Sequence, residues 1–206
     1  MKRTLHIATI LLMIHLLGGA AWAQSATDTV MAKAQRGNAE AQYQMGVRLY
    51  KGIGQKANFA QAITWFQKAA AQGHAMAMTQ LGTAYYFGEG VARNYTQAVL
   101  WYQKAAATGL PEAMRLLGVC YEDGFGTPKN LIKAHEWYQK AAAGGDATAM
   151  FFLAHLYDNG DGVQKDARVA THWYEQAALH GHSKSMLIVS KRYEQGIGTE
   201  VNKEKA

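Results

Sequence analysis

The chain has 206 residues, of which 49% are apolar and 17% are charged, and its formal net charge is +6. This length and apolar content predict a folded chain and exclude an intrinsically disordered one. The charges are scattered rather than gathered in a basic stripe with interleaved aromatic residues, so a nucleic-acid partner is not expected. The single cysteine, Cys120, excludes an internal disulfide and is expected to act as a small buried apolar residue.

The first 23 residues have the composition of an export signal. Two basic residues precede an apolar run over residues 7–17, and the tripeptide Ala21-Trp22-Ala23 forms a small-x-small site before Gln24. We therefore expect a signal peptide over 1–23, cleavage after Ala23, and a periplasmic or secreted mature protein. An uncleaved anchor is the alternative, but the apolar run is shorter than the roughly 18 to 20 residues of a spanning helix. No membrane span is expected after signal cleavage.

A period of 36 residues runs through the rest of the chain. All four tryptophans of the mature chain fall in one phase of it: Trp65, Trp101, Trp137 and Trp173. Two glycine series keep the same step, at 52, 88, 124, 160 and 196 and at 54, 90, 126, 162 and 198. Self-similarity of this kind is typical of repeat proteins, in which each unit touches only its neighbours.

Within the unit at residues 77–109, the spacing predicts a first helix. Ala77, Leu81 and Tyr85 fall at i, i+4 and i+8 and form one apolar stripe. Gly88 and Gly90 then end this helix, because glycine readily adopts the left-handed conformation that follows many helix C-termini.

A second helix is expected to begin at Asn94, which can cap it in an arrangement that Asn58 repeats one period earlier. We expect the rings of Trp101 and Tyr102 to fill the volume between successive units, while small residues such as Gly82 let helices approach closely. A single pair of helices cannot hide its apolar faces, so the units must stack into an all-α solenoid.

The combined pattern, A-x-x-x-L-G-x-x-Y-x-x-G-x-G followed by A-x-x-W-Y-x-K-A-A-x-x-G, resembles the Sel-1-like repeat family, relatives of the tetratricopeptide repeats. The resemblance implies an α/α solenoid, a right-handed superhelix of 36-residue helix-turn-helix units. Its expected parts are an N-terminal half-repeat cap at 24–37, four full repeats at 38–73, 74–109, 110–145 and 146–181, and an incomplete fifth repeat at 182–206.

The chain ends inside this fifth repeat. Asn202 occupies the capping position of Asn58 and Asn94, and Ala206 aligns with Ala170. From this position we expect either a truncated chain or a frayed end that pairs with another molecule.

No catalytic residue is expected. The mature chain has four serines, none of which lies in a G-x-S-x-G or S-x-x-K motif: Ser25, Ser183, Ser185 and Ser190. A β-lactamase-like or cell-wall-acting hydrolase, as claimed for cysteine-rich members of the family, remains the alternative. Those members carry paired cysteines in each repeat, which this chain lacks.

No cofactor or metal is expected either. The segment Asp158–Gly162 alternates oxygen donors with glycine, but a calcium loop starting there would need a glutamate where Val169 stands. His172, His180 and His182 are close in sequence and leave zinc binding as a weaker alternative, although their spacing fits no recognised site.

We instead expect a protein partner to bind the concave side of the solenoid, on positions of the first helices that the motif leaves open. The resemblance implies an envelope protein, a cell-wall enzyme or a host factor as this partner, bound by an exported scaffold or adaptor. The expected groove residues are Tyr43, Tyr50, Met76, Thr83, Tyr86, Phe87, Arg115, Glu122, Phe151 and His155. Exposed aromatic and arginine side chains make good anchors, and we expect Tyr86 and Phe87 to be the main ones. The alternative is that some of these rings pack into neighbouring units instead.

Overall fold

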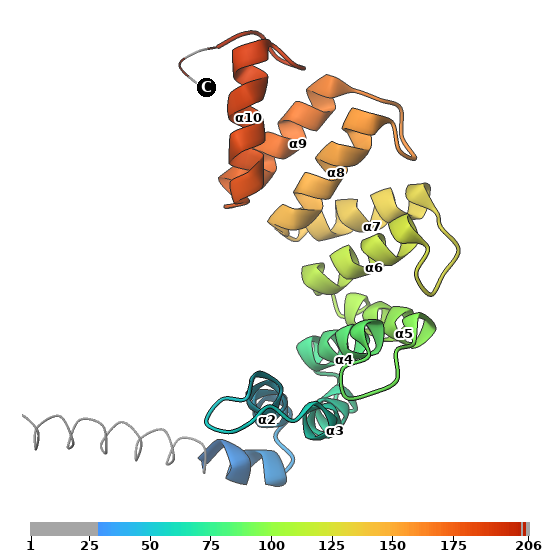
Figure 1. The fold of residues 1–206 in the computed structure, drawn as a ribbon, viewed down its shortest axis with the longest axis vertical. Helices are drawn as coiled ribbons and strands as arrows, with labels where there is room; N and C mark the ends of the chain where they lie inside the picture. Colours follow the sequence, from blue (N-terminus) through green and yellow to red (C-terminus); the bar gives the residue numbers. More distant parts are fainter. Residues whose placement is uncertain (1–28, 203, 205–206) are drawn as a thin grey trace, which may run out of the picture. The chain divides into compact units, whose positions relative to one another are not determined.

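The computed structural model describes residues 29–202 and 204, and every regular element among them is a helix (Figure 1). The expected signal peptide, residues 24–28 of the expected cap, and residues 203, 205 and 206 of the fifth repeat lie outside the described part. The chain divides into two compact units, unit 1 up to residue 72 and unit 2 from residue 73, which are taken separately below. In the described part, no helix combines the length and apolar character that a bilayer crossing requires.

The described part of unit 1 begins with a helix at residues 29–35. It continues with α2 (Ala39–Lys51) and α3 (Phe59–Ala70), which pack against each other as a hairpin. Ala34 of the leading helix is buried in one cluster with Met45 of α2, and the Trp65 ring packs against that cluster. The leading helix therefore covers one face of the first hairpin.

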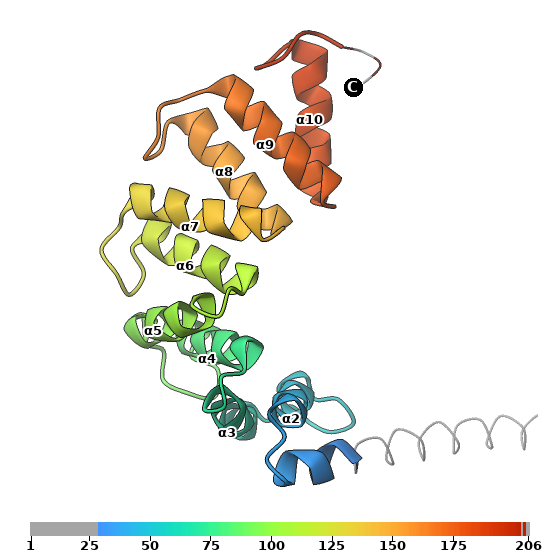
Figure 2. The same cartoon turned by 180° about the vertical axis from the view of Figure 1, so that it is seen from behind.

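The described part of unit 2 forms three helical hairpins and one further helix, whose order along the chain can be followed in Figure 2. In chain order its helices are α4 (Ala75–Phe87), α5 (Tyr95–Ala106), α6 (Pro111–Asp123), α7 (Leu131–Ala143), α8 (Ala147–Asn159), α9 (Ala167–Leu179) and α10 (Ser183–Gln195). The helices of each hairpin pack together, and each hairpin also touches the next through α5 with α6, α7 with α8, and α9 with α10. The predicted all-α repeat solenoid is confirmed.

Repeated local chemistry sets the helix ends. Each first helix of a repeat ends at a glycine whose φ lies between 68° and 83°: Gly52, Gly88, Gly124, Gly160 and Gly196. Only glycine takes this conformation without steric cost. The second helices begin at capping side chains, as predicted. The Oδ1 atoms of Asn58, Asn94 and Asn130 each accept a hydrogen bond from the backbone N–H three residues on, at 2.9 to 3.0 Å.

Another glycine of each early repeat lies under an aromatic ring. A Cβ atom on Gly82 would lie 2.5 Å from Cε1 of Tyr102, whose side chain is 1% exposed. The neighbouring Trp101 was predicted to share this interior, but it is only partly buried, and the Lys104 ammonium lies 4.4 Å from its ring centroid. Tyrosine thus occupies the interior, while the tryptophan lies nearer the surface.

The second glycine of three turns in unit 2, Gly126, Gly162 and Gly198, lies against the preceding repeat. A Cβ atom on Gly126 would lie 2.2 Å from the carbonyl oxygen of Tyr95, and one on Gly198 would lie 2.0 Å from that of Ala167. The turns after α6, α8 and α10 therefore rest directly on the backbone at the start of the preceding repeat's second helix.

Candidate functional site

A cavity of about 250 Å³ in unit 2 brings together four of the ten predicted groove residues. They come from the first helices of two adjacent repeats, α4 and α6: Thr83, Tyr86, Phe87 and Arg115. Tyr102, Leu116 and Val119 complete the lining, which is mostly apolar. We refer to it as the unit 2 cavity.

An aromatic cluster borders this cavity and consists of Tyr86, Phe87, Tyr95 and Phe125. The Tyr86 ring is at its centre, in edge-on contact with Phe87 at 5.0 Å, Tyr95 at 5.1 Å and Phe125 at 5.7 Å between ring centroids. The Phe87 side chain is 63% exposed and that of Phe125 is 37% exposed. Tyr86 and Phe87 were predicted as anchors, whereas Tyr95 and Phe125 were missed because neither occupies a first-helix position.

The sister repeats show that the fold does not require this exposed ring. The position of Phe87 holds a polar residue in every other repeat: Lys51, Asp123, Asn159 and Gln195. The same helix C-terminus forms in all five repeats. Phe87 is therefore a local departure from the repeat pattern, and the helix C-terminus does not require its ring.

Polar groups at the cavity are held in fixed positions. The Thr83 Oγ1 and Tyr102 hydroxyl atoms lie 3.2 Å apart in a hydrogen bond. Burial raises the pKa of Tyr102 far above its usual value, so this phenol stays protonated. The Arg115 Nε donates to Oδ2 of Asp146 at 3.0 Å, with side chains 20% and 12% exposed. Within the described residues, the two terminal nitrogens of Arg115 have no hydrogen-bond or ion-pair partner.

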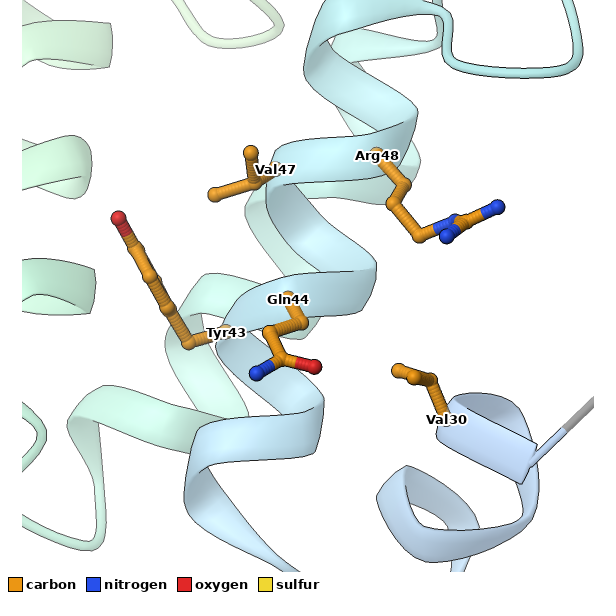
Figure 3. Close-up of a pocket in the computed structure, with 5 residues that line it drawn as sticks. All are labelled: Val30, Tyr43, Gln44, Val47 and Arg48. Atoms are coloured by element: carbon orange, nitrogen blue, oxygen red, sulfur yellow. The ribbon is translucent and has the colours of Figure 1, made fainter. Parts of the chain in front are cut away.

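Two predicted groove residues belong to unit 1. Tyr43 lines a second cavity of about 250 Å³, together with Val30, Gln44, Val47 and Arg48 (Figure 3). In Figure 3, Tyr43 and Val47 project from one side of α2, and Arg48 lies on the other side, toward Val30. Tyr50 instead packs edge-on against Phe59 at 5.1 Å.

The remaining predicted groove residues do not line the unit 2 cavity. Met76 is 44% exposed, and Glu122 accepts a hydrogen bond from the Tyr138 hydroxyl. Phe151 packs against Tyr174 of its own repeat at 5.8 Å and against His182 of the next repeat at 4.7 Å between ring centroids. His155 is exposed, and its ring lies within hydrogen-bond distance of the Asn159 amide. For Phe151, the structure favours the alternative that the ring packs into the next repeat.

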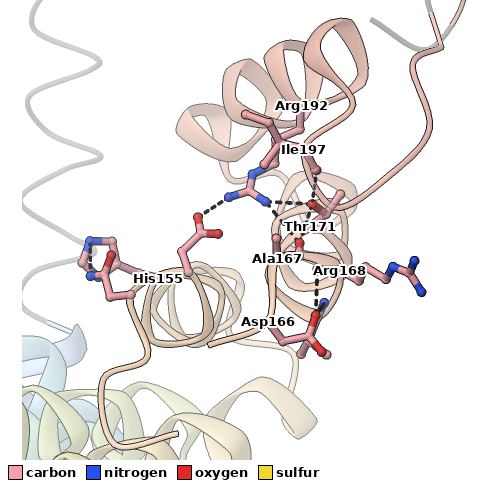
Figure 4. Close-up of polar contacts among 10 residues, drawn as sticks. His155, Asp166, Ala167, Arg168, Thr171, Arg192 and Ile197 are labelled. Atoms are coloured by element: carbon pink, nitrogen blue, oxygen red, sulfur yellow. Dashed lines mark hydrogen bonds and ion pairs between the residues drawn. The ribbon is translucent and has the colours of Figure 1, made fainter. Parts of the chain in front are cut away.

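A buried arginine network, not predicted from the sequence, joins α8, α9 and α10 (Figure 4). Arg192 is 7% exposed and forms an ion pair with Asp158, the residue that opens the glycine-rich segment considered above for calcium. Its Nη1 donates to Thr171 Oγ1 at 2.8 Å and to the Ala167 carbonyl at 3.3 Å. The Cζ atom of the Arg192 guanidinium lies over the Tyr174 ring, 4.9 Å from its centroid. This network fixes the last helix to the two before it.

One serine lies beside a histidine, at the start of α10. The Ser185 Oγ is 2.8 Å from Nδ1 of His182, a pair that the sequence patterns did not indicate. Ser185 is 0% exposed, and the same Nδ1 accepts its backbone N–H at 3.3 Å. Burial, together with Lys184, lowers the pKa of His182. A fully buried hydroxyl cannot reach a substrate, so the pair acts as a helix cap.

The histidines weighed for zinc are not gathered into a site. His180 Nδ1 lies 2.9 Å from the Gln176 carbonyl, His172 packs beside the Trp173 ring, and His182 caps α10. Across residues 29–202 and 204, no group of three or more His, Cys, Asp or Glu side chains could hold a metal ion.

Comparison with known proteins places these repeats in a family. The model of the Sel1 repeat matches residues 39–74, 75–110, 111–146, 147–182 and 183–206. No curated protein matches the chain.

Solved structures agree with this assignment. The chain is 38% identical to c5321, a protective antigen of uropathogenic Escherichia coli with an SLR fold, at a TM-score of 0.80, covering 85% of this chain and 38% of that one. It is 35% identical to a Sel1 repeat protein from Oxalobacter formigenes, at a TM-score of 0.82, covering 89% of this chain and 73% of that one. Cysteine-rich protein B of Helicobacter pylori is 24% identical at a TM-score of 0.52, over 63% of this chain and 93% of that one, which is a likeness of fold alone. The chain thus spans less than half the length of c5321. With Sel1 matches covering residues 39–206, the chain belongs to the Sel1 repeat family.

Proposed function

We propose that this protein is an exported scaffold or adaptor that binds a protein partner through its first helices, with the unit 2 cavity as the main anchor site. Sel1 repeat proteins mediate protein–protein interactions, which makes a protein the expected class of partner. The signal-like residues 1–23 support export, and they make an envelope protein, a cell-wall enzyme or a host factor the partner to seek.

The observation that carries the proposal is the exposed Phe87 ring beside the cavity. It is 63% exposed, and it contacts Tyr86, which also lines the cavity. Covering such a ring in a complex is worth about 2 kcal/mol by area. Aromatic and arginine side chains around a small pocket are typical of the residues that dominate binding energy in interfaces.

The hydrolase alternative gains no support from the described residues. Its requirement is a nucleophile next to a base in an accessible pocket. Ser185 beside His182 is fully buried and caps a helix, and the unit 2 cavity is lined by neither residue.

The test is affinity capture from an envelope extract, followed by measurement of the dissociation constant of the captured partner. We expect Phe87→Lys, which installs the residue that the first repeat carries at Lys51, to raise this constant at least tenfold. Leu100→Lys is the matched control, because Leu100 is also an exposed apolar residue, at 44%, but does not line the cavity. Equal constants for wild type and Phe87→Lys, with unchanged circular dichroism, would contradict the proposal.

A further inference from the structure

We infer that the partner inserts an aromatic side chain into the unit 2 cavity, and that a neutral main-chain carbonyl of the same segment accepts hydrogen bonds from Arg115. This inference rests on the proposed function and adds the chemistry of the partner segment. Three properties of the cavity carry it: its size, its rings and the fixed position of one guanidinium.

The size of the cavity suits one side chain. Its volume of about 250 Å³ lies below the roughly 300 to 1,000 Å³ that is usual for a small-molecule site. A folded element cannot enter such a space, but a single large side chain can. The rest of the partner segment must then lie outside the cavity, over α4 and α6.

The rings favour an aromatic over an aliphatic side chain. Tyr86 and Phe87, two rings of the lining, are in edge-on contact, and α6 adds the apolar side chains of Leu116 and Val119. An additional ring can pack edge to face with the cluster, which contributes about 0.5 to 1.5 kcal/mol beyond the burial of its area. An aliphatic side chain of similar size obtains only the area contribution.

Arg115 provides the only cationic donor of the lining, and its two terminal nitrogens are not already used within the described residues. Thr83 and Tyr102 bond to each other, whereas Arg115 is bound to Asp146 through Nε alone. Because one end of the guanidinium is held, its two terminal nitrogens are pre-organised for an acceptor, and little side-chain entropy is lost on binding.

The charge of this pair selects the kind of acceptor. Asp146 lies 3.0 Å from Arg115 and already balances the positive charge. A second carboxylate would gain little from a neutralised arginine and would be repelled by Asp146. A main-chain carbonyl takes the same N–H groups without that repulsion, and every partner segment carries one next to its side chain.

The test uses nuclear magnetic resonance titrations of the ¹⁵N-labelled mature protein with small probes. The probes are N-acetyl-phenylalanine N-methylamide, its alanine counterpart, and N-acetyl-phenylalanine with a free carboxylate. We expect the phenylalanine amide to shift the backbone signals of Thr83, Phe87 and Val119. The alanine amide should bind at least fivefold more weakly, and the free carboxylate should bind no more tightly than the amide.

Variants then separate the two contacts. Phe87→Lys should weaken binding of the phenylalanine amide at least fivefold. Arg115→Met should weaken it about tenfold and should also reduce the difference in affinity between the amide and the free acid. Leu100→Lys should change neither. Because Arg115→Met also removes the partner of Asp146, Arg115→Lys is the second variant; it keeps the charge but lacks the planar fork of donors, and an intermediate loss is expected.

Three results would overturn the inference. The first is equal binding of the phenylalanine and alanine amides. The second is binding of the free carboxylate that is tenfold tighter than that of the phenylalanine amide. The third is that chitotriose shifts the same signals more than the phenylalanine amide does, which would indicate a glycan ligand instead. The two proposals fail separately. If Phe87→Lys abolishes capture of the partner but no aromatic probe binds, only this inference is wrong. If the probes bind but Phe87→Lys leaves the partner's affinity unchanged, the proposed function is wrong.

Discussion

The Tyr138 ring lies directly on Gly118, so that a Cβ atom added to this glycine would be 2.5 Å from Cε1 of the ring. Tyr138 is 0% exposed and has no space into which it can withdraw freely. We therefore expect Gly118→Ala to lower the free energy of unfolding by about 1 to 3 kcal/mol through overpacking. Urea denaturation followed by circular dichroism measures this.

The sign of the change in the free energy of unfolding distinguishes overpacking from the ordinary effect of alanine in a helix. In an exposed helix, glycine to alanine stabilises by about 1 kcal/mol. The fourth repeat, which carries Ala154 at the equivalent position, provides the control: Ala154→Gly should destabilise through helix propensity. A gain in stability for Gly118→Ala would show that the ring moves aside without cost.

Removing the buried arginine should release the last helix. Arg192→Met deletes the ion pair with Asp158 and the hydrogen bond to Thr171, and we expect a loss of about 2 kcal/mol, less than for a fully buried pair because Asp158 is 25% exposed. Hydrogen exchange should accelerate in α10 but not in α4. Arg168→Met, at an exposed arginine of α9, is the matched control and should leave α10 exchange unchanged.

Cys120 should be inert in the folded protein. It is 1% exposed, and burial, with a smaller contribution from Asp123, raises its pKa to about 12. Because the thiolate is the reactive form, we expect Ellman's reagent at pH 8 to label Cys120 only after denaturation. Ser183→Cys in a Cys120→Ala background supplies an exposed thiol as the control. Rapid labelling of Cys120 in native protein would contradict its burial.

Acid should weaken the fold in part through His135. Burial lowers the pKa of His135, with Glu136 opposing the effect, and its Nε2 lies 3.1 Å from the Tyr157 hydroxyl. The unfolded chain therefore binds more protons between the folded pKa and about 6.5, so stability falls as the pH drops through that window. Denaturation midpoints at pH 7.5 and 5.5 should differ less in His135→Asn than in wild type. An unchanged difference would rule out a contribution from His135, and His172→Asn, at an exposed histidine, is the control.

Local features of the fold were predictable because the residues that cause them are close in sequence. A glycine ends each first helix, and Asn94 caps its helix from three residues away, so a single repeat contains the full cause of its own hairpin. Because the same pattern recurs every 36 residues, the hairpin predicted for one repeat is also predicted for the others. The role of tryptophan was harder to predict, since hydrophobicity alone does not say which of two adjacent rings, Trp101 or Tyr102, faces the glycine.

Features that depend on one side chain in one repeat were not predictable. Arg192 joins residues 21 to 34 positions earlier in the chain, whereas the second, third and fourth repeats hold Ala84, Cys120 and Leu156 at its position. Phe125 enters the aromatic cluster from a turn, where the repeat pattern marks only the glycines. The unit 2 cavity was partly predicted, because Thr83, Tyr86, Phe87 and Arg115 occupy the first-helix positions that the motif leaves open.

The contact between three turns of unit 2 and the preceding repeat has an evolutionary consequence. Gly126 meets the backbone of Tyr95, Gly162 that of Leu131, and Gly198 that of Ala167, so an aromatic, an aliphatic and a small residue serve equally well. The contact between the turn glycine and this backbone therefore does not depend on which side chain the contacted residue carries. A gene segment that encodes one such unit can therefore be duplicated, deleted or exchanged by recombination, and the encoded repeat still fits its new neighbours. The number of repeats can then change in whole units, while single binding residues such as Phe87 diverge separately.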